Sequence, residues 1–405
     1  MARSKTDLTL LFSTRILRLF AYGFLSVILA LYLAQAGLNE KQIGLLFTLT
    51  LAGDAVISLA LTMVADRLGR RRLLVLGAIL MVFAGVIFVI TSNFIFLLVA
   101  AIIGVISPSG NEIGPFLSIE QAALSQLLPY ERRTHVFAWY NLAGSFATAF
   151  GALCGGWTTH VLQASGWPPF EAYRFILIGY LASGIFLALF FICLSPAVEI
   201  ASATTSLKKS FGLQQSKDVV LKLSVLFALD AFAGGFFIQS FMAYWFHLKF
   251  GAEPGMLGSI FFGANILAGI SALLAAKIAR RFGLINTMVF THIPSNVLLA
   301  LVPLMPSLSW AIGVLLLRFS ISQMDVPTRQ SYTMAVVPPE ERSAASGITT
   351  IARSVGASLS PALSGLLLAQ ASLISAPFFL AGGLKIIYDV LLYRSFKTLR
   401  PPEEV

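Results

Sequence analysis

The stretch ADRLGRRR, Ala65 to Arg72, decides how the rest of this sequence is interpreted. An acid ends an apolar run, a glycine permits a tight reversal, and three arginines open the next apolar run. Arginines at such a junction prefer the polar interface between water and the bilayer. The stretch therefore predicts a short loop between two membrane-spanning helices, 42–65 and 73–92.

Apolar runs of this kind recur along the whole chain. Of its 405 residues, 57% are hydrophobic and 11% are charged, against roughly 25% charged in ordinary soluble domains. Since a membrane-spanning helix needs about 20 mostly apolar residues, the sequence predicts an all-α integral membrane protein and excludes a water-soluble fold. The twelve predicted spans are 9–36, 42–65, 73–92, 94–127, 136–158, 174–195, 218–248, 255–279, 284–305, 308–336, 343–371 and 375–396.

The net charge of +10 is explained by topology and not by a nucleic-acid partner. Of the 28 Lys and Arg residues, nineteen lie on one side of the predicted spans, three lie on the other side, and six lie inside the spans. By the positive-inside rule both termini are cytoplasmic. The expected location is the plasma membrane, which is the inner membrane if the source is a bacterium.

The two halves of the chain resemble each other. LPYERRT (128–134) aligns with VPPEERS (337–343) at an offset of 209 residues. At an offset of 214, the glycines at the ends of the first two spans and in the loop after them align with those of the seventh and eighth; these are Gly37, Gly44 and Gly69 with Gly251, Gly258 and Gly283. Such self-similarity is typical of repeat-built transporters. It predicts six-helix bundles at 1–195 and 218–405, joined by a cytoplasmic linker at 196–217.

In the loop at 65–72 the chain resembles the major facilitator superfamily, whose signature is Gly-x3-Asp-Arg-x-Gly-Arg-Arg. Five positions match, and the leading glycine is replaced by Thr62; the matching residues are Asp66, Arg67, Gly69, Arg70 and Arg71. The resemblance implies two pseudo-symmetric bundles that rock about a central cavity in alternating access, which is a secondary transport mechanism. It also implies that the matching residues stabilise one state of a gate. The alternative is that the basic run only sets topology.

A weaker resemblance concerns GALCGGW (151–157), which is similar to the antiporter motif of the drug-exporting branch but lacks its proline. It favours export. The alternative is ordinary close packing of helices through Gly151 and Gly155.

Acids inside the spans are the strongest candidates for proton coupling, because a charged group in the bilayer is costly and usually faces a cavity or a partner. Asp54 and Asp230 lie near the middle of their spans, and each is a coupling candidate or a permanently paired structural acid. Glu112 is the third candidate. It lies in SPSGNEIGP (107–115), whose prolines and glycines must break the helix, so this segment is either the binding site or a hinge.

Polar residues elsewhere in the spans complete the candidate sites. The substrate-cavity candidates are Arg18, Asn111, Glu112, Gln239, Asn265, Arg318 and Asp325. Further gate candidates are Glu120, Arg329 and Arg353; the first two occupy equivalent repeat positions and are hypothesised to pair across the pseudo-twofold axis. Arg15 is suited to reach the interface. Lys385 and Asp389 are four residues apart and are expected to pair with each other. His292 is interpreted as a packed or hydrogen-bonded residue.

The function that these patterns favour is proton-coupled export of a small organic compound by a monomeric secondary transporter, an antiporter. Uptake by proton symport is one alternative, and a receptor or scaffold without flux is another. The sequence contains no P-loop, HExxH or Gly-x-Ser-x-Gly motif, so neither ATP hydrolysis nor an enzyme activity is expected. The two cysteines lack metal-ligand spacing, and no cofactor or metal is expected. The expected partners are the solute, an ion gradient and the lipid bilayer.

Overall fold

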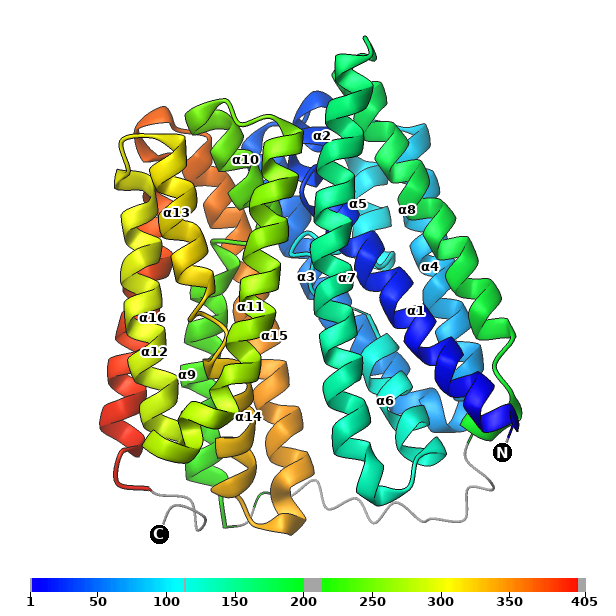
Figure 1. The fold of residues 1–405 in the computed structure, drawn as a ribbon, viewed down its shortest axis with the longest axis vertical. Coiled ribbons are helices and arrows are strands. Elements are labelled where there is room, and N and C mark those ends of the chain that lie inside the picture. Colours follow the sequence, from blue (N-terminus) through cyan, green and yellow to red (C-terminus); the bar gives the residue numbers. More distant parts are fainter. Residues whose placement is uncertain (1, 113, 200–212, 214, 400–405) are drawn as a thin grey trace. The chain divides into compact units, whose positions relative to one another are not determined.

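The computed structural model describes residues 2–112, 114–199, 213 and 215–399. The side chain of Asp66 lies outside the description, so its predicted gate role stays a prediction. The described residues are almost entirely helical (Figure 1). They form two compact units. The first holds residues up to 199 together with Gln239–Phe262, and the second holds residues from 213 to 238 and from 263 onward.

The helices of the first unit are α1 (Ala2–Ser26), α2 (Leu29–Gln35), α3 (Glu40–Leu68), α4 (Arg70–Ile90), α5 (Phe94–Ile103), α6 (Phe116–Leu127), α7 (Tyr130–Ala164), α8 (Pro169–Ile192) and α10 (Gln239–Phe250). The helices of the second unit are α9 (Lys217–Gly235), α12 (Leu284–Leu301), α13 (Leu308–Phe319), α14 (Asp325–Ala335), α15 (Arg342–Leu368) and α16 (Ala376–Phe396). Helix α11 (Pro254–Phe282) begins in the first unit and ends in the second. Its first turns and α10 therefore pack with the first unit, although they follow the predicted linker. The predicted limits 1–195 and 218–405 stay a prediction.

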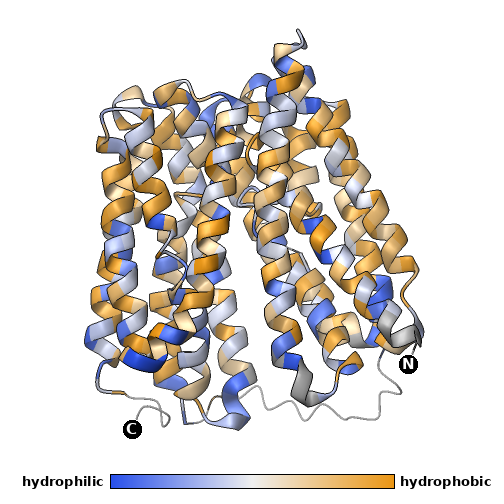
Figure 2. Ribbon diagram, viewed as in Figure 1, coloured by the Kyte–Doolittle hydropathy of each residue, from blue (hydrophilic) through white to orange (hydrophobic). Residues whose placement is uncertain are grey.

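Length and composition make most of these helices able to cross a bilayer. Among the described residues, nine helical segments satisfy both requirements, and α5 and α13 are shorter apolar helices. Figure 2 shows hydrophobic residues along the middle of the helices, with hydrophilic residues mainly near the ends and at isolated positions between. The fold is thus an all-α integral membrane fold, as predicted, while the count of twelve spans remains an expectation.

Four of the predicted spans are broken into two helices each. These are the first (α1 and α2), the fourth (α5 and α6), the seventh (α9 and α10) and the tenth (α13 and α14). Helix α1 ends at Ser26 and α9 ends 209 residues later at Gly235; α6 begins at Phe116 and α14 begins 209 residues later at Asp325. The repeat seen in the loops is therefore also present in the positions where helices break, and only the fourth break was predicted.

Helix packing repeats in the same way within each unit. Helix α1 packs most extensively on α7, and α9 packs most extensively on α15. A side chain at Gly151 or Gly155 would place its Cβ atom 2.1 Å from the carbonyl oxygen of Phe20 or 2.2 Å from that of Phe24. Close packing of α7 on α1 therefore explains these glycines without an antiporter function.

Candidate functional site

The broken fourth span brings polar backbone into the first unit. Gly110 and Gly114 have φ values of +70° and +80°, which favour glycine and end helical geometry between α5 and α6. Backbone groups freed at such a break must find partners inside a bilayer. The amide of Gly114 donates to Asp54, and the Pro108 carbonyl accepts from the amide and hydroxyl of Ser240 at 3.0 and 2.7 Å. The segment is therefore held in a defined conformation that presents Glu112.

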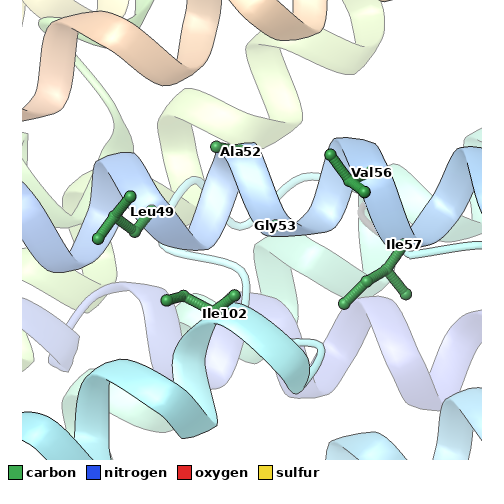
Figure 3. Close-up of a pocket in the computed structure, with 6 residues that line it drawn as sticks. All are labelled: Leu49, Ala52, Gly53, Val56, Ile57 and Ile102. Carbon is green, nitrogen blue, oxygen red and sulfur yellow. The ribbon is translucent and has the colours of Figure 1, made fainter.

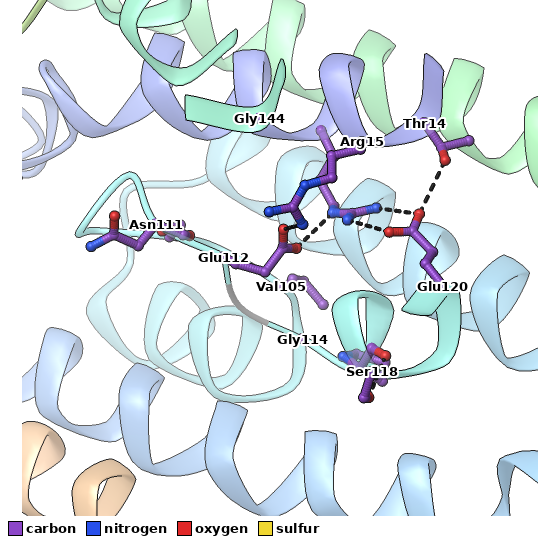
Figure 4. A network of polar contacts seen from close by, with 12 residues as sticks. Thr14, Arg15, Val105, Asn111, Glu112, Gly114, Ser118, Glu120 and Gly144 are labelled. Carbon is purple, nitrogen blue, oxygen red and sulfur yellow. Dashed lines mark hydrogen bonds and ion pairs between the residues drawn. The ribbon is translucent and has the colours of Figure 1, made fainter. Parts of the chain in front are cut away.

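Glu112 belongs to a buried ion-pair network with two arginines of α1. Its carboxylate lies 2.5 Å from Nη1 of Arg15 and 2.8 Å from Nε of Arg18. Arg18 also forms a bidentate pair with Glu120 of α6, at 2.8 and 2.7 Å, and both side chains are fully buried. Figure 4 shows Glu112 reaching from the loop and Glu120 from α6 into this network. Two cations thus meet two acids, so this set of four residues is electrically balanced.

Neutral side chains complete the bonding of Glu120. Thr14 donates to it over 3.0 Å, and the Tyr140 hydroxyl donates to its other oxygen. Arg15 is buried, donates to the Tyr140 carbonyl at 3.1 Å and stacks over the Tyr140 ring. The expectation that Arg15 reaches the interface is therefore wrong, because Glu112 and Tyr140 hold it inside the unit.

Asp54 differs from the other acids of this unit's spans. Its carboxylate accepts from the Gly114 amide at 2.6 Å and from the Ser58 hydroxyl at 3.1 Å. Among the described residues, no cation lies within ion-pair distance of it. Asp54 therefore has partners that suit either a charged or a neutral carboxyl group, and it holds the loop that carries Glu112.

The second unit contains a cluster around Asp230 of α9. Its two oxygens lie 2.5 Å from Lys385 Nζ, 3.2 Å from Arg329 Nη1 and 3.1 Å from Arg353 Nη1. The three cations come from α16, α14 and α15, so one carboxylate ties three helices to α9. Arg329 also pairs with Asp325 at 2.7 Å. Asp230 therefore has the contacts of a permanently paired acid. Of the two roles predicted for it, these contacts favour the structural one over proton coupling.

The partners of Lys385 and Asp389 correct a prediction made from their spacing. Lys385 binds Asp230, whereas Asp389 accepts from Asn296 at 3.1 Å and lies 2.8 Å from Nδ1 of His292. The expected pairing of Lys385 with Asp389 is wrong, because the faces of α9 and α12 that pack on α16 supply other partners. His292 is hydrogen-bonded, as interpreted, and its acid comes from a distant helix that the sequence did not indicate.

The two networks lie on equivalent helices, and one pair of equivalent positions carries opposite charges. The position of Arg18 in the first unit is that of Phe227 in the second, at an offset of 209, and Glu120 corresponds to Arg329. Arg329 lies over the Phe227 ring, 5.5 Å from its centroid. The acid of the second network comes instead from α9, at Asp230. In the first unit, α1 supplies the base and α6 the acid of the pair Arg18–Glu120. In the second unit, the equivalent helix α9 supplies the acid and α14 the base of the pair Asp230–Arg329.

Glu120 and Arg329 each have ion-pair partners within their own unit, Arg18 for the first and Asp230 and Asp325 for the second. The hypothesis that they pair with each other in an inner gate stays a prediction.

The loop at 65–72 is anchored by an acid that the sequence analysis did not select. Gly69 turns the chain with a φ of +98°. Glu199 then accepts from the backbone amides of Arg70 and Arg71 at 2.7 and 3.1 Å, where the N-terminus of α4 favours a negative charge. The Arg70 side chain is buried and donates to Gln126 at 2.8 Å. These contacts tie the loop to the segment after α8, whereas Arg67 is exposed.

The remaining substrate-cavity candidates do not gather at one place. Gln239 donates to the Ser26 hydroxyl at 2.8 Å at the break between α1 and α2. Asn111 is exposed on the broken segment, and Asn265 is half-buried on α11 in the second unit. Arg318 ends α13 beside the break in the tenth predicted span. Asn111, Gln239 and Arg318 thus lie at or beside helix breaks, and the substrate-cavity role of these candidates stays a prediction.

Residues next to Asp54 in the sequence line a groove of about 300 Å³, which is apolar, unlike the polar candidate sites. It is lined by apolar residues of α3 and by Ile102 of α5 (Figure 3). The α3 residues are Leu49, Ala52, Gly53, Val56 and Ile57. Its lining has no group to orient a polar solute, so the polar candidates above remain the candidate site.

Broken helices that place ionisable side chains in the middle of apolar spans are typical of membrane transporters. The chain matches the family model described as Major Facilitator Superfamily over residues 11–361. The chain therefore belongs to the major facilitator superfamily, as the loop at 65–72 indicated. Proteins of this family are transporters and not enzymes.

Individual relatives agree with this assignment. The chain is 30% identical to the uncharacterized membrane protein YJR124C of Saccharomyces cerevisiae over 417 residues, which cover 95% of this chain and 93% of that protein. A bacterial homologue of the human lysosomal transporter Spinster superposes with a TM-score of 0.75 at 18% identity, covering 98% of both chains. A crystal structure of the nucleoside transporter NupG gives 0.74 at 15% identity, covering 96% of this chain and 99% of that one. At such identities the solved structures show the fold alone.

Proposed function

We propose that this chain is a proton-coupled secondary transporter in which Asp54 carries the coupled proton. The observation that supports this choice is the bonding of three candidate acids. Glu112 and Asp230 are each paired with two or more cations, so protonating either one would leave buried cations uncompensated. Asp54 accepts only neutral donors among the described residues, and it can gain a proton without that cost.

The position of Asp54 also links its protonation to the rest of the unit. Gaining a proton weakens the charge-assisted bond that it accepts from the Gly114 amide. That amide belongs to the broken segment carrying Glu112, which pairs with Arg15 and Arg18 of α1. Protonation would therefore loosen the anchor of a segment that joins three helices. A change of this kind is what alternating access needs from a coupling residue.

Transport direction is a separate question. Export was favoured by the glycines at 151–157, and helix packing accounts for Gly151 and Gly155. Export and uptake by symport therefore both remain as proposals, and counterflow in oriented proteoliposomes decides between them. The distribution of basic residues supports cytoplasmic termini, and the plasma membrane is the proposed location. We also propose that the monomer is the transporting unit.

Replacing Asp54 with asparagine is expected to abolish solute-driven proton movement while leaving solute binding in place. The amide oxygen of asparagine can still accept from Gly114 and Ser58, so the broken segment keeps its anchor, but the side chain no longer titrates. The solute is first taken as the compound that most raises the Tm of the purified protein, since a ligand stabilises the folded state by mass action. Proton movement is then followed in proteoliposomes containing a pH-sensitive dye.

Asp218→Asn is the matched control, because Asp218 is an exposed acid in the first turn of α9. It should leave proton movement unchanged. An unaltered ratio of protons to solute in the Asp54→Asn variant contradicts the coupling role. Failure of the wild-type protein to move any solute would contradict transport itself and support the scaffold alternative.

A further inference from the structure

Arg318 stands apart from the other cations inside the predicted spans. Five of the six have a carboxylate oxygen within 3.2 Å; these are Arg15, Arg18, Arg329, Arg353 and Lys385. Arg318 makes no hydrogen bond or ion pair among the described residues, and its Nε atom is buried without a partner. Its two terminal nitrogens are not among the buried unbonded atoms, so they face accessible space.

The surroundings of Arg318 compensate its charge only in part. Its guanidinium carbon lies 4.8 Å from the centroid of the Phe319 ring. Asp325 attracts Arg318 electrostatically, but its carboxylate lies 2.7 Å from Arg329 and forms no ion pair with Arg318. Arg318 ends α13 while α14 continues the same predicted span, so it lies at mid-span and cannot reach an interface by extending its side chain. A cation in this position in a bilayer is energetically costly unless something binds it.

The charges of the whole second unit point the same way. Away from the span ends, this unit contains four cations, Arg318, Arg329, Arg353 and Lys385, and three acids, Asp230, Asp325 and Asp389. With His292 neutral, one positive charge is in excess. The excess belongs to Arg318, since the acids are bound by other groups.

We infer that Arg318 is the anchor of a substrate subsite for an organic oxyanion, a carboxylate or a phosphate monoester, in the second unit. The inference rests on the proposed transport function and gives it a substrate class. A guanidinium group presents a planar set of donors that matches both kinds of oxyanion in bidentate geometry. Binding would neutralise the excess charge and give the accessible nitrogens their partners. The helix break beside Arg318 places the group where a solute can approach both α13 and α14.

A binding experiment without any gradient tests the substrate class separately from proton coupling. Purified full-length protein in phosphatidylcholine nanodiscs is screened by thermal shift against aliphatic and aromatic carboxylates and phosphate monoesters. Each anion is paired with its neutral amide or alcohol. Anions should raise the Tm and their neutral partners should not. Arg318→Gln should weaken the apparent affinity by at least about tenfold, and Arg318→Lys should weaken it less.

Arg281→Gln is the matched control. Arg281 is exposed and, like Arg318, lies over the phenylalanine that follows it. It should leave every anion-induced shift unchanged. A second arm replaces the neutral lipid with phosphatidylglycerol in the absence of soluble anions. A shift that occurs only with this lipid overturns the inference in favour of a lipid headgroup, and stabilisation by neutral or cationic compounds alone overturns it as well.

The unliganded protein supplies an independent readout that needs no ligand. Arg318→Met should raise its Tm by a few degrees, because methionine removes a charge that has no ion-pair partner among the described residues and can still pack on the Phe319 ring. Arg281→Met should change the Tm little. A lower Tm for Arg318→Met would mean that the guanidinium stabilises the fold, which overturns the subsite. Unaltered proton coupling in the Asp54→Asn variant, together with intact anion binding, would contradict the role of Asp54 and leave the subsite standing.

Discussion

The Asp230→Asn variant is expected to lose about 3–5 kcal/mol of folding free energy, because it removes the carboxylate that three buried cations share. Lys385, Arg329 and Arg353 approach Asp230 from three helices, at 2.5, 3.2 and 3.1 Å. An amide oxygen can still accept a hydrogen bond, but it supplies no charge. Arg329 keeps Asp325, whereas Lys385 and Arg353 keep no acid among their described partners. The second unit should therefore lose its cooperative packing.

The measurement is the Tm and the monodisperse fraction of protein purified from membranes. Combining Asp230→Asn with Lys385→Met should recover part of the loss, since the double change removes one of the uncompensated cations. The coupling between the two substitutions then gives their interaction free energy. Asp218→Asn, the exposed acid on the same helix, should behave as wild type. A Tm for Asp230→Asn equal to that of wild type would show that the cations are compensated by other means.

The Gly356→Ala variant is expected to be destabilised by about 1–3 kcal/mol or more, because its Cβ atom would overpack the contact of α15 with α9. That atom would lie 2.2 Å from the carbonyl oxygen of Ala228, which is backbone and cannot rotate away. Helices α9 and α15 form the most extensive helix pair of the second unit. Separating them to admit a methyl group would also disturb Arg353, which bridges from α15 to Asp230 on α9.

Gly347 lies on the same helix and provides a control of opposite sign. A Cβ atom there would meet no atom within 4 Å, and the residue is exposed. Gly347→Ala should leave the Tm unchanged or raise it, since alanine favours a helix over glycine by up to about 1 kcal/mol. Thermal unfolding of the two variants in the same detergent provides the comparison. Equal effects of both alanines would show that helix propensity, and not close packing, governs these positions.

Helix breaks show how far the sequence predicted the candidate site. The fourth break was predicted because Pro108, Gly110, Gly114 and Pro115 interrupt hydrogen bonding directly. The first break has no comparable signal: α1 ends at Ser26 and α2 begins at Leu29 in an apolar run. The carbonyl of Ser26 shares the Ser240 hydroxyl, far along the chain, with the Pro108 carbonyl. A break that depends on such a partner has no signature in the local sequence.

The sequence by itself determined the class of this protein, from the twelve apolar runs predicted outward from ADRLGRRR to the loops that repeat at an offset of 209. These features depend on segment length, local turn chemistry and the cost of burying charge in lipid. Each of these is set by residues that are close together in the sequence. Only the tertiary structure decided which charges compensate one another. Lys385 binds Asp230 and not Asp389, and Arg318 has no ion-pair partner among the described residues. Ion pairing depends on which helix faces meet, and the packing of distant segments sets those faces.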